Sequence, residues 1–141
     1  MLPRIAVFVA PALLAMTPIL ASAVDGTSPP LELVASNVRD TPYTAVIEIT
    51  GAEKADEVRG YVRFRVRGAV IETIKGSAVD HIEYFETHEA PTNGPKWSSR
   101  VLVSLRKAPD GTLFAPDNGY VFPATDAVIG EARKATRGPQ H

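Results

Sequence analysis

The sequence predicts an all-β fold, a small antiparallel barrel with a β-sandwich as the alternative and a possible short C-terminal helix. Two observations lead to this prediction. Six or seven short segments rich in β-branched residues follow one another, with turn residues and no helical segments between them. One segment near the middle is long and interrupted by a glycine, as in a strand that bends to close a barrel.

The clearest strand lies at 61–67, where apolar residues and arginines alternate. The two sets are Val62, Phe64 and Val66 against Arg63, Arg65 and Arg67. Because successive strand side chains point to opposite faces, one face is apolar and the other carries three guanidinium groups. Gly68 marks a bulge or bend, after which the strand continues to Ile74.

The other elements follow from composition and turn residues. Further strands are expected at 31–35, 43–49, 81–87, 97–105, 112–114 and 120–122. Turns or loops are expected at 37–42, 89–96, 108–111 and 116–119. The polar segment 50–57 is expected to form a loop or one helical turn. Residues 126–136 fit a terminal helix with Asp126 as its N-cap, which Gly130 weakens.

The first 23 residues predict a secretory signal peptide. Arg4 gives a basic start, an apolar run extends from Ile5 to Leu20, and Ala21-Ser22-Ala23 supplies the small residues of a cleavage site. The run is shorter than the roughly 20 residues that cross a bilayer, and two prolines interrupt it. Cleavage after Ala23 leaves a flexible leader (24–30), one β-rich domain (31–136) and a tail (137–141). We therefore expect a periplasmic or secreted protein without a membrane anchor.

Charge and cysteine content narrow the classes of partner. The chain has 141 residues, 15 of them basic and 16 acidic, so losing Arg4 with the signal leaves 14 against 16, a net charge of −2. This near neutrality gives no reason to expect a nucleic acid or an anionic membrane as partner. The absence of cysteine fits a bacterial periplasm better than an animal extracellular space, and it excludes a lipoprotein anchor.

A family resemblance rests on four segments. They are YVRFRVRGAVIETIKG (61–76), WSSRVLVSLRK (97–107), the Asp-Gly turn at 110–111 and GYVFP (119–123). In this order they resemble the netrin/metalloproteinase-inhibitor type of OB-fold over about residues 43–124. The resemblance implies an OB-like barrel, and such barrels often bind oligonucleotides or sugars. The animal members are disulfide-bonded and the inhibitors chelate metal through an N-terminal cysteine. This chain has no cysteine, so inhibition is not carried over.

The candidate ligand-binding residues are Arg63, Arg65 and Arg67, with Arg59 upstream, and Trp97. The arginines would form a basic groove for a polyanion or a carboxylate. The alternative is a solvated face paired with acids of the next strand, namely Glu83, Glu86 and Glu89. Trp97, with Tyr120 and Phe122, would form a partner platform or plug one end of the barrel.

Catalytic and metal chemistry have little support in the sequence. His81 and Glu83 share a strand face, but His88 is seven residues from His81 and faces the other way. The chain has no Gly-x-Ser-x-Gly elbow and no phosphate-binding loop, and Asp110 and Asp117 belong to turns. No catalytic residue, metal or cofactor is predicted.

Three functions stay open at this point. The first is an exported, non-enzymatic binding module for a protein or an envelope component. The second is an inhibitor of an envelope-acting protease or lysozyme that presents the loop 89–96. The third is a small hydrolase whose site is assembled from distant residues, recognisable by a concave polar cluster with a strongly perturbed pKa. The oligomeric state is equally open.

Overall fold

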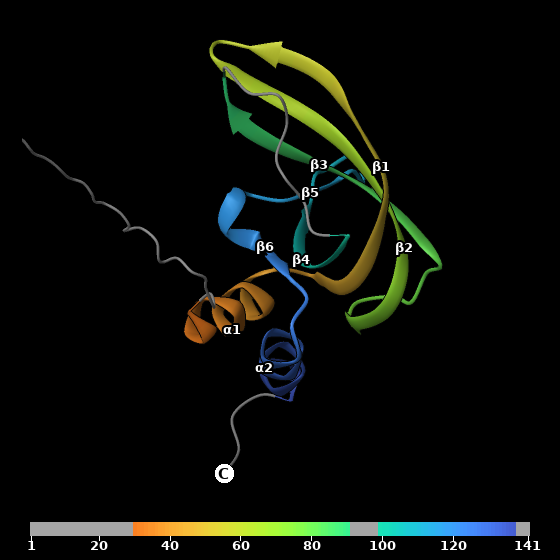
Figure 1. The fold of residues 1–141 in the computed structure, drawn as a ribbon, viewed down its shortest axis with the longest axis vertical. Helices are drawn as coiled ribbons and strands as arrows, with labels where there is room; N and C mark the ends of the chain where they lie inside the picture. The colour runs from red at the N-terminus through yellow and green to blue at the C-terminus, as the bar shows by residue number, and fades with distance from the viewer. Residues whose placement is uncertain (1–29, 91–98, 138–141) are drawn as a thin grey trace, which may run out of the picture.

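The computed structural model describes residues 30–90 and 99–137. Figure 1 shows a curled sheet with two helices below it. The elements, in chain order, are α1 (Leu31–Asp40), β1 (Tyr43–Val58), β2 (Tyr61–Lys75), β3 (His81–Glu89), β4 (Arg100–Lys107), β5 (Leu113–Phe114), the short 3₁₀ helix η4 (Asn118–Tyr120), β6 (Val121–Pro123) and α2 (Asp126–Thr136). The prediction of an all-β fold with a short C-terminal helix is confirmed.

Five of the six strands close into a ring, which favours a barrel over a sandwich. The sheet order is β1-β2-β3-β5-β4-β6, and an additional pairing of β1 with β4 completes the ring. All neighbours are antiparallel except β3 and β5, which run parallel over Tyr84–Phe85 and Leu113–Phe114. The prediction of a small all-β barrel is confirmed.

Gly68 lies where the long hairpin of β1 and β2 bends. The register shifts between Ile49 and Gly51, directly opposite Gly68, so the predicted irregularity is present and its extra residue lies on β1. A Cβ atom at Gly68 would lie 2.8 Å from Ile47 Cδ1 and 3.1 Å from the Glu48 carbonyl oxygen. A side chain at this position would therefore crowd both groups where the two backbones approach each other at the bend.

Three predicted elements are wrong. The segment 31–35, expected as a strand, and most of the expected turn at 37–42 form the helix α1. Its buried valines, Val34 and Val38, have the i, i+4 spacing of a helix, a pattern that a short apolar run conceals. The segment 50–57, expected as a loop, is the second half of β1 and pairs with β2. Its polar composition reflects the exposure of its side chains to solvent.

Two hydrophobic cores share the strands β1 and β4. Ile47 of β1 and Val103 of β4 point into the barrel, where they meet the apolar side of β2 and β3. The intervening Val46 and Leu102 point outward and are covered by α1 and α2. Both faces of the first half of β1 and of the middle of β4 are therefore buried, which explains the nearly continuous apolar sequences of these segments.

The helix α2 begins at the predicted residue, but its cap differs. The Thr125 hydroxyl, not Asp126, accepts a hydrogen bond from the Val128 amide and caps the helix.

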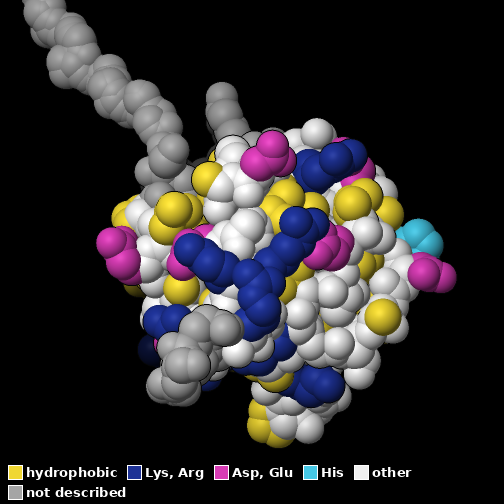
Figure 2. Space-filling model, turned by 90° about the horizontal axis from the view of Figure 1, so that it is seen from below, with side chains coloured by type: hydrophobic (Ala, Val, Ile, Leu, Met, Phe, Trp, Pro, Cys, Tyr) yellow, Lys and Arg dark blue, Asp and Glu magenta, His cyan; other side chains and the backbone are white. Residues whose placement is uncertain are grey.

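Seen from the helical side, Lys and Arg side chains gather near the centre of the face (Figure 2). In α2, Arg133 and Lys134 form ion pairs with Glu72 and Glu131. Among the described residues, no helix is long and apolar enough to cross a membrane.

Candidate functional site

The predicted arginine row lies on the outer surface of β2. Val62, Phe64 and Val66 are buried in the barrel, as the alternation predicts. Arg63 and Arg67 are about half exposed, and Arg65 is somewhat more covered. We call these three arginines the arginine row.

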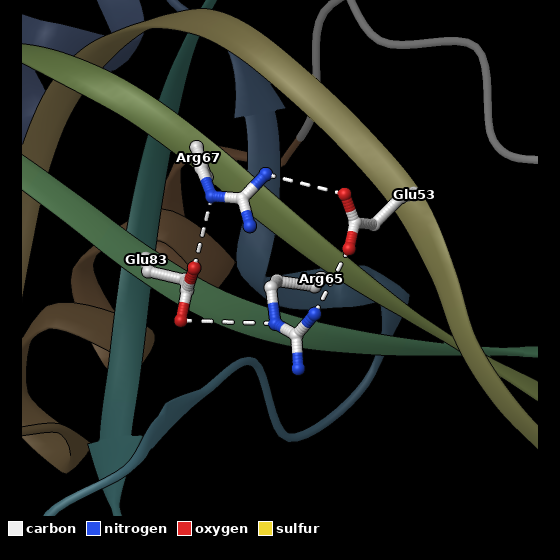
Figure 3. Close-up of polar contacts among 4 residues, drawn as sticks. All are labelled: Glu53, Arg65, Arg67 and Glu83. Carbon is white, nitrogen blue, oxygen red and sulfur yellow. Dashed lines mark hydrogen bonds and ion pairs between the residues drawn. The ribbon is translucent and has the colours of Figure 1, made fainter.

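Carboxylates of the two neighbouring strands bracket the arginine row. Glu53 of β1 accepts hydrogen bonds from Arg65 Nη1 at 2.9 Å and Arg67 Nη1 at 3.3 Å. On the other side, Glu83 of β3 accepts one from Arg67 Nε at 3.0 Å and lies 3.7 Å from Arg65 Nε (Figure 3). The hydrogen bonds from Arg67 and then Arg65 lower the pKa of Glu53 below its ordinary value. The four side chains thus form one network across three strands.

Arg63 extends this network along the strand. Its Nη2 lies 2.6 Å from Asp56 Oδ2, and its guanidinium group lies 4.8 Å from the centre of the Phe85 ring. The arginine row is therefore matched by the three carboxylates Glu53, Asp56 and Glu83 of the same protein. A polyanion would have to displace these partners, so the geometry corresponds more closely to the paired face than to a basic groove.

One expected partner of the arginines points the other way. Glu86 lies inside the barrel and is 4% exposed. Its Oε2 accepts a hydrogen bond from the Tyr84 hydroxyl at 2.6 Å, and its Oε1 lies 3.0 Å from His88 Nε2. The prediction that Glu86 pairs with the outer arginines is wrong. The spacing in the sequence could have shown this, because Glu83 and Glu86 are three residues apart and hence face opposite sides of a strand.

Tyr84, Glu86 and His88 form a buried polar row on the inner side of β3, and we call it the inner triad. Burial, followed by the neighbouring Glu86 charge, raises the pKa of Tyr84 far above its ordinary value. Its hydroxyl therefore keeps its proton and donates to the carboxylate. The His88 ring is also held by an edge-on contact with Phe64, with ring centres 5.9 Å apart. These contacts fix the orientation of the imidazole.

An open pocket of about 510 Å³ lies beside His88 at one end of the barrel. Its walls are the end of β3 (Thr87–Glu89), Tyr61 at the start of β2, and the segment Pro116–Asn118. A second hollow of about 310 Å³ shares Tyr61 and Thr87 with it and extends to Val58. We call the two together the barrel-end groove. Sequence reasoning missed it because its walls come from three separate segments.

The remaining predicted sites are the histidines, the two turn aspartates and a set of residues that the structure does not describe. His81 is exposed while His88 is largely buried, and the part of the chain that the structure describes contains no cluster of three potential metal ligands. The turn roles of Asp110 and Asp117 are confirmed, since their carboxylates accept hydrogen bonds from the amides of Thr112 and Gly119. Trp97, the predicted signal segment 1–23 and most of the predicted loop 89–96 lie outside the described residues.

Comparison with known proteins assigns no family to this chain. No protein-family model matches the chain, and no curated protein matches it either. The barrel-end groove and the inner triad are therefore the features from which a function is inferred.

Proposed function

We propose that this protein is an exported, non-enzymatic binding module that takes a protein or an envelope component in the barrel-end groove. The observation that carries the proposal is the groove itself, which combines an open hollow with a wall that is already ordered. His88 is held by Glu86 and Phe64 before any ligand arrives. A preformed wall lowers the entropy lost on binding.

Exposed apolar side chains support the same location. Val58 is 59% exposed and Tyr61 is 50% exposed, and both line the groove at the tip of the β1–β2 hairpin. Large apolar side chains exposed together are typical of interaction surfaces. A tyrosine at such a place is a common anchor, because it offers a rigid ring and a hydroxyl group.

The proposed compartment rests on the sequence features of residues 1–23 and on the absence of cysteine. The likeness to the netrin/metalloproteinase-inhibitor barrels stays a prediction, and so does the second candidate of an inhibitor acting through the loop 89–96. The five-stranded ring is compatible with both.

Site-specific crosslinking in living cells tests the binding proposal. A photoreactive phenylalanine analogue replaces Tyr61 in the full chain, and the matched control carries it at Ile71, which is exposed on the same strand but does not line the groove. We expect a discrete adduct from position 61 and not from position 71. Identical adduct patterns, or none from position 61, would contradict binding in the groove.

The inner triad favours one further candidate, the small hydrolase. A buried carboxylate that orients a histidine beside a pocket is the arrangement of a general base with its orienting partner. A panel of ester and peptide substrates, tested with His88→Gln and with the outward-facing control His81→Gln, examines this candidate. Turnover that is lost only in His88→Gln would favour the enzyme over the binding module.

A further inference from the structure

We propose that the edge of β3 at Thr87–Glu89, which no described strand covers, binds a short extended peptide segment bearing a lysine or arginine as an added strand. This inference rests on the proposed function and specifies the mode and the partner: β-strand addition by a basic protein segment. Main-chain hydrogen bonds supply affinity in this mode, while alternate side chains supply specificity.

Hydrogen bonds on both sides show which way the β3 main chain points. The Ala115 amide donates to the Phe85 carbonyl oxygen at 2.9 Å, so Phe85 directs its main-chain groups away from β2 and toward β5. The Ala90 amide donates to the Gly60 oxygen at 2.6 Å, so the even-numbered residues at this end face β2. Because the direction alternates along an antiparallel strand, Thr87 and Glu89 direct their amide and carbonyl groups away from β2. That side is the barrel-end groove.

The strand that could cover this edge ends too early. β5 has only two residues, and it pairs with Tyr84 and Phe85. After the amide of Ala115, which donates to Phe85, the next amide that would face β3 is that of Asp117. The chain then turns at Asp117, whose carboxylate holds the Gly119 amide at 2.7 Å. Within residues 30–90 and 99–137, no strand pairs with Thr87–Glu89 on this side.

The groove has the dimensions of a short strand-addition site. Three residues of this edge span roughly 10 Å. The pocket of about 510 Å³ lies between this edge and Pro116–Asn118. Such a short ladder gives only a few main-chain hydrogen bonds, so at least one side chain of the peptide must anchor it.

The charges of the groove indicate a basic anchor. Glu89 and Asp117 lie on opposite walls, and neither forms an ion pair with another described residue. The arginine row, in contrast, already has its carboxylate partners. Tyr61 adds an aromatic ring at the rim, a surface on which a guanidinium or ammonium group is stabilised. A lysine or arginine of the added strand thus meets a ring and two carboxylates that have no cationic partner among the described residues.

Peptide selection followed by affinity measurement tests the inference. Random heptapeptides displayed on phage are selected on the wild-type full chain and counter-selected on Thr87→Pro. Proline at this exposed edge removes the outward amide and leaves the bonds to β2 in place. We expect enriched peptides with alternating side chains and a lysine or arginine at a fixed position.

Synthetic versions of the best peptide then separate the two parts of the proposal. Methylation of alternate peptide nitrogens removes the amide hydrogens that would donate to β3. It should therefore weaken binding about tenfold or more. Glu89→Gln should weaken binding about fivefold at low salt, and the distant control Glu32→Gln on α1 should leave it unchanged. Methylation acts on the peptide, so this measurement stands even where Thr87→Pro does not fold.

The outcomes distinguish this inference from the proposed function. Equal binding of the methylated peptide overturns strand addition, and selected peptides without a basic residue overturn the basic anchor. A selection that enriches nothing, while the crosslinker at Tyr61 still captures a partner, overturns the inference and leaves the binding module standing. Adducts that contain glycan instead of protein would show an envelope polysaccharide as the occupant.

Discussion

At the scale of single residues, Glu86 is the charged side chain that is buried among the described residues. A carboxylate removed from water is costly unless hydrogen bonds replace its hydration. Glu86 has such bonds from Tyr84 and His88 within the inner triad. The outer arginines, in contrast, keep contact with solvent, so each of their ion pairs contributes only about 0–1 kcal/mol. The residues that look most distinctive in the sequence are therefore not those with the largest expected effect.

The first prediction concerns the hydroxyl of Tyr84. Tyr84→Phe removes the 2.6 Å donor to Glu86 and leaves a buried carboxylate with one fewer partner. We expect the free energy of unfolding to fall by about 1–3 kcal/mol, measured by urea denaturation. Tyr61→Phe removes the same atom from an exposed ring and should have an effect near zero. Equal effects of the two substitutions would contradict the structural role of the inner triad.

At the scale of secondary-structure elements, the long hairpin of β1 and β2 shapes the barrel. It bends where Gly68 allows the backbone of β2 to approach Ile47 and Glu48. The polar second half of β1 extends beyond the point where β4 leaves it, and Glu53 and Asp56 of this half contact the arginine row. The bend and the extension together place the tip of the hairpin at the barrel-end groove.

The second prediction compares two glycines of this hairpin. Gly68→Ala should destabilise the fold by about 1–3 kcal/mol, because its methyl group would overlap Ile47 and crowd a carbonyl oxygen. Gly51→Ala, on the partner strand, has nothing within 4 Å of the new methyl group and should be neutral or slightly stabilising. Thermal unfolding of the two variants measures the difference. A Gly68→Ala protein as stable as Gly51→Ala would exclude the close approach.

The third prediction concerns the attachment of α2 to β2. Arg133 donates to both oxygens of Glu72, at 2.6 and 2.8 Å, and these bonds lower the pKa of Glu72 below its ordinary 4.5. A lowered folded-state pKa gives stability that is present above the unfolded pKa and is lost as the pH falls through the folded pKa. Glu72→Gln should therefore cost up to about 1 kcal/mol near neutral pH and little in acid, measured by urea denaturation.

Glu32→Gln serves as the control for this pH dependence, since Glu32 lies in the first turn of α1, away from the Glu72–Arg133 contact. A difference between wild type and Glu72→Gln that stays constant with pH would mean that the ion pair does not link α2 to β2.

At the scale of the whole molecule, the barrel and the helices share two strands, and we therefore expect them to unfold as one cooperative unit. The strands β1 and β4 contribute to the core inside the barrel with one face and to the core under the helices with the other. A substitution in either core therefore affects the other core through the backbones of β1 and β4.

The fourth prediction follows from these shared strands. Leu102→Ala, on the helix-facing side of β4, should cost about 2–5 kcal/mol, since Leu102 is almost fully buried. The helical signal in the far ultraviolet and the tyrosine signal of the barrel should shift together to the same lower midpoint. Helices that melt while the barrel signal persists would show two separate units.

The sequence by itself determined the all-β class and the two faces of β2, while the ring of five strands decided for a barrel. The alternation of Val62, Phe64 and Val66 with arginines is local, so it predicted which side chains are buried without knowledge of any neighbour. Other local signals, a glycine within a strand and a polar residue before a helix, predicted the bend at Gly68 and the start of α2, although the capping residue differs. It failed for α1, where a short apolar run fits a strand and a helix equally well until the surface that it covers is known.

Only the tertiary structure decided the candidate site. Tyr61, Glu89 and Asp117 are far apart in the chain, and ring closure brings them to one end of the barrel. Likewise, the pairing of Arg65 and Arg67 with Glu53 depends on the register of β1 against β2 across the bulge. Composition and periodicity describe which face a residue occupies, whereas a site depends on which distant residues share a space. That sharing is set by strand order and register, and no local pattern encodes it.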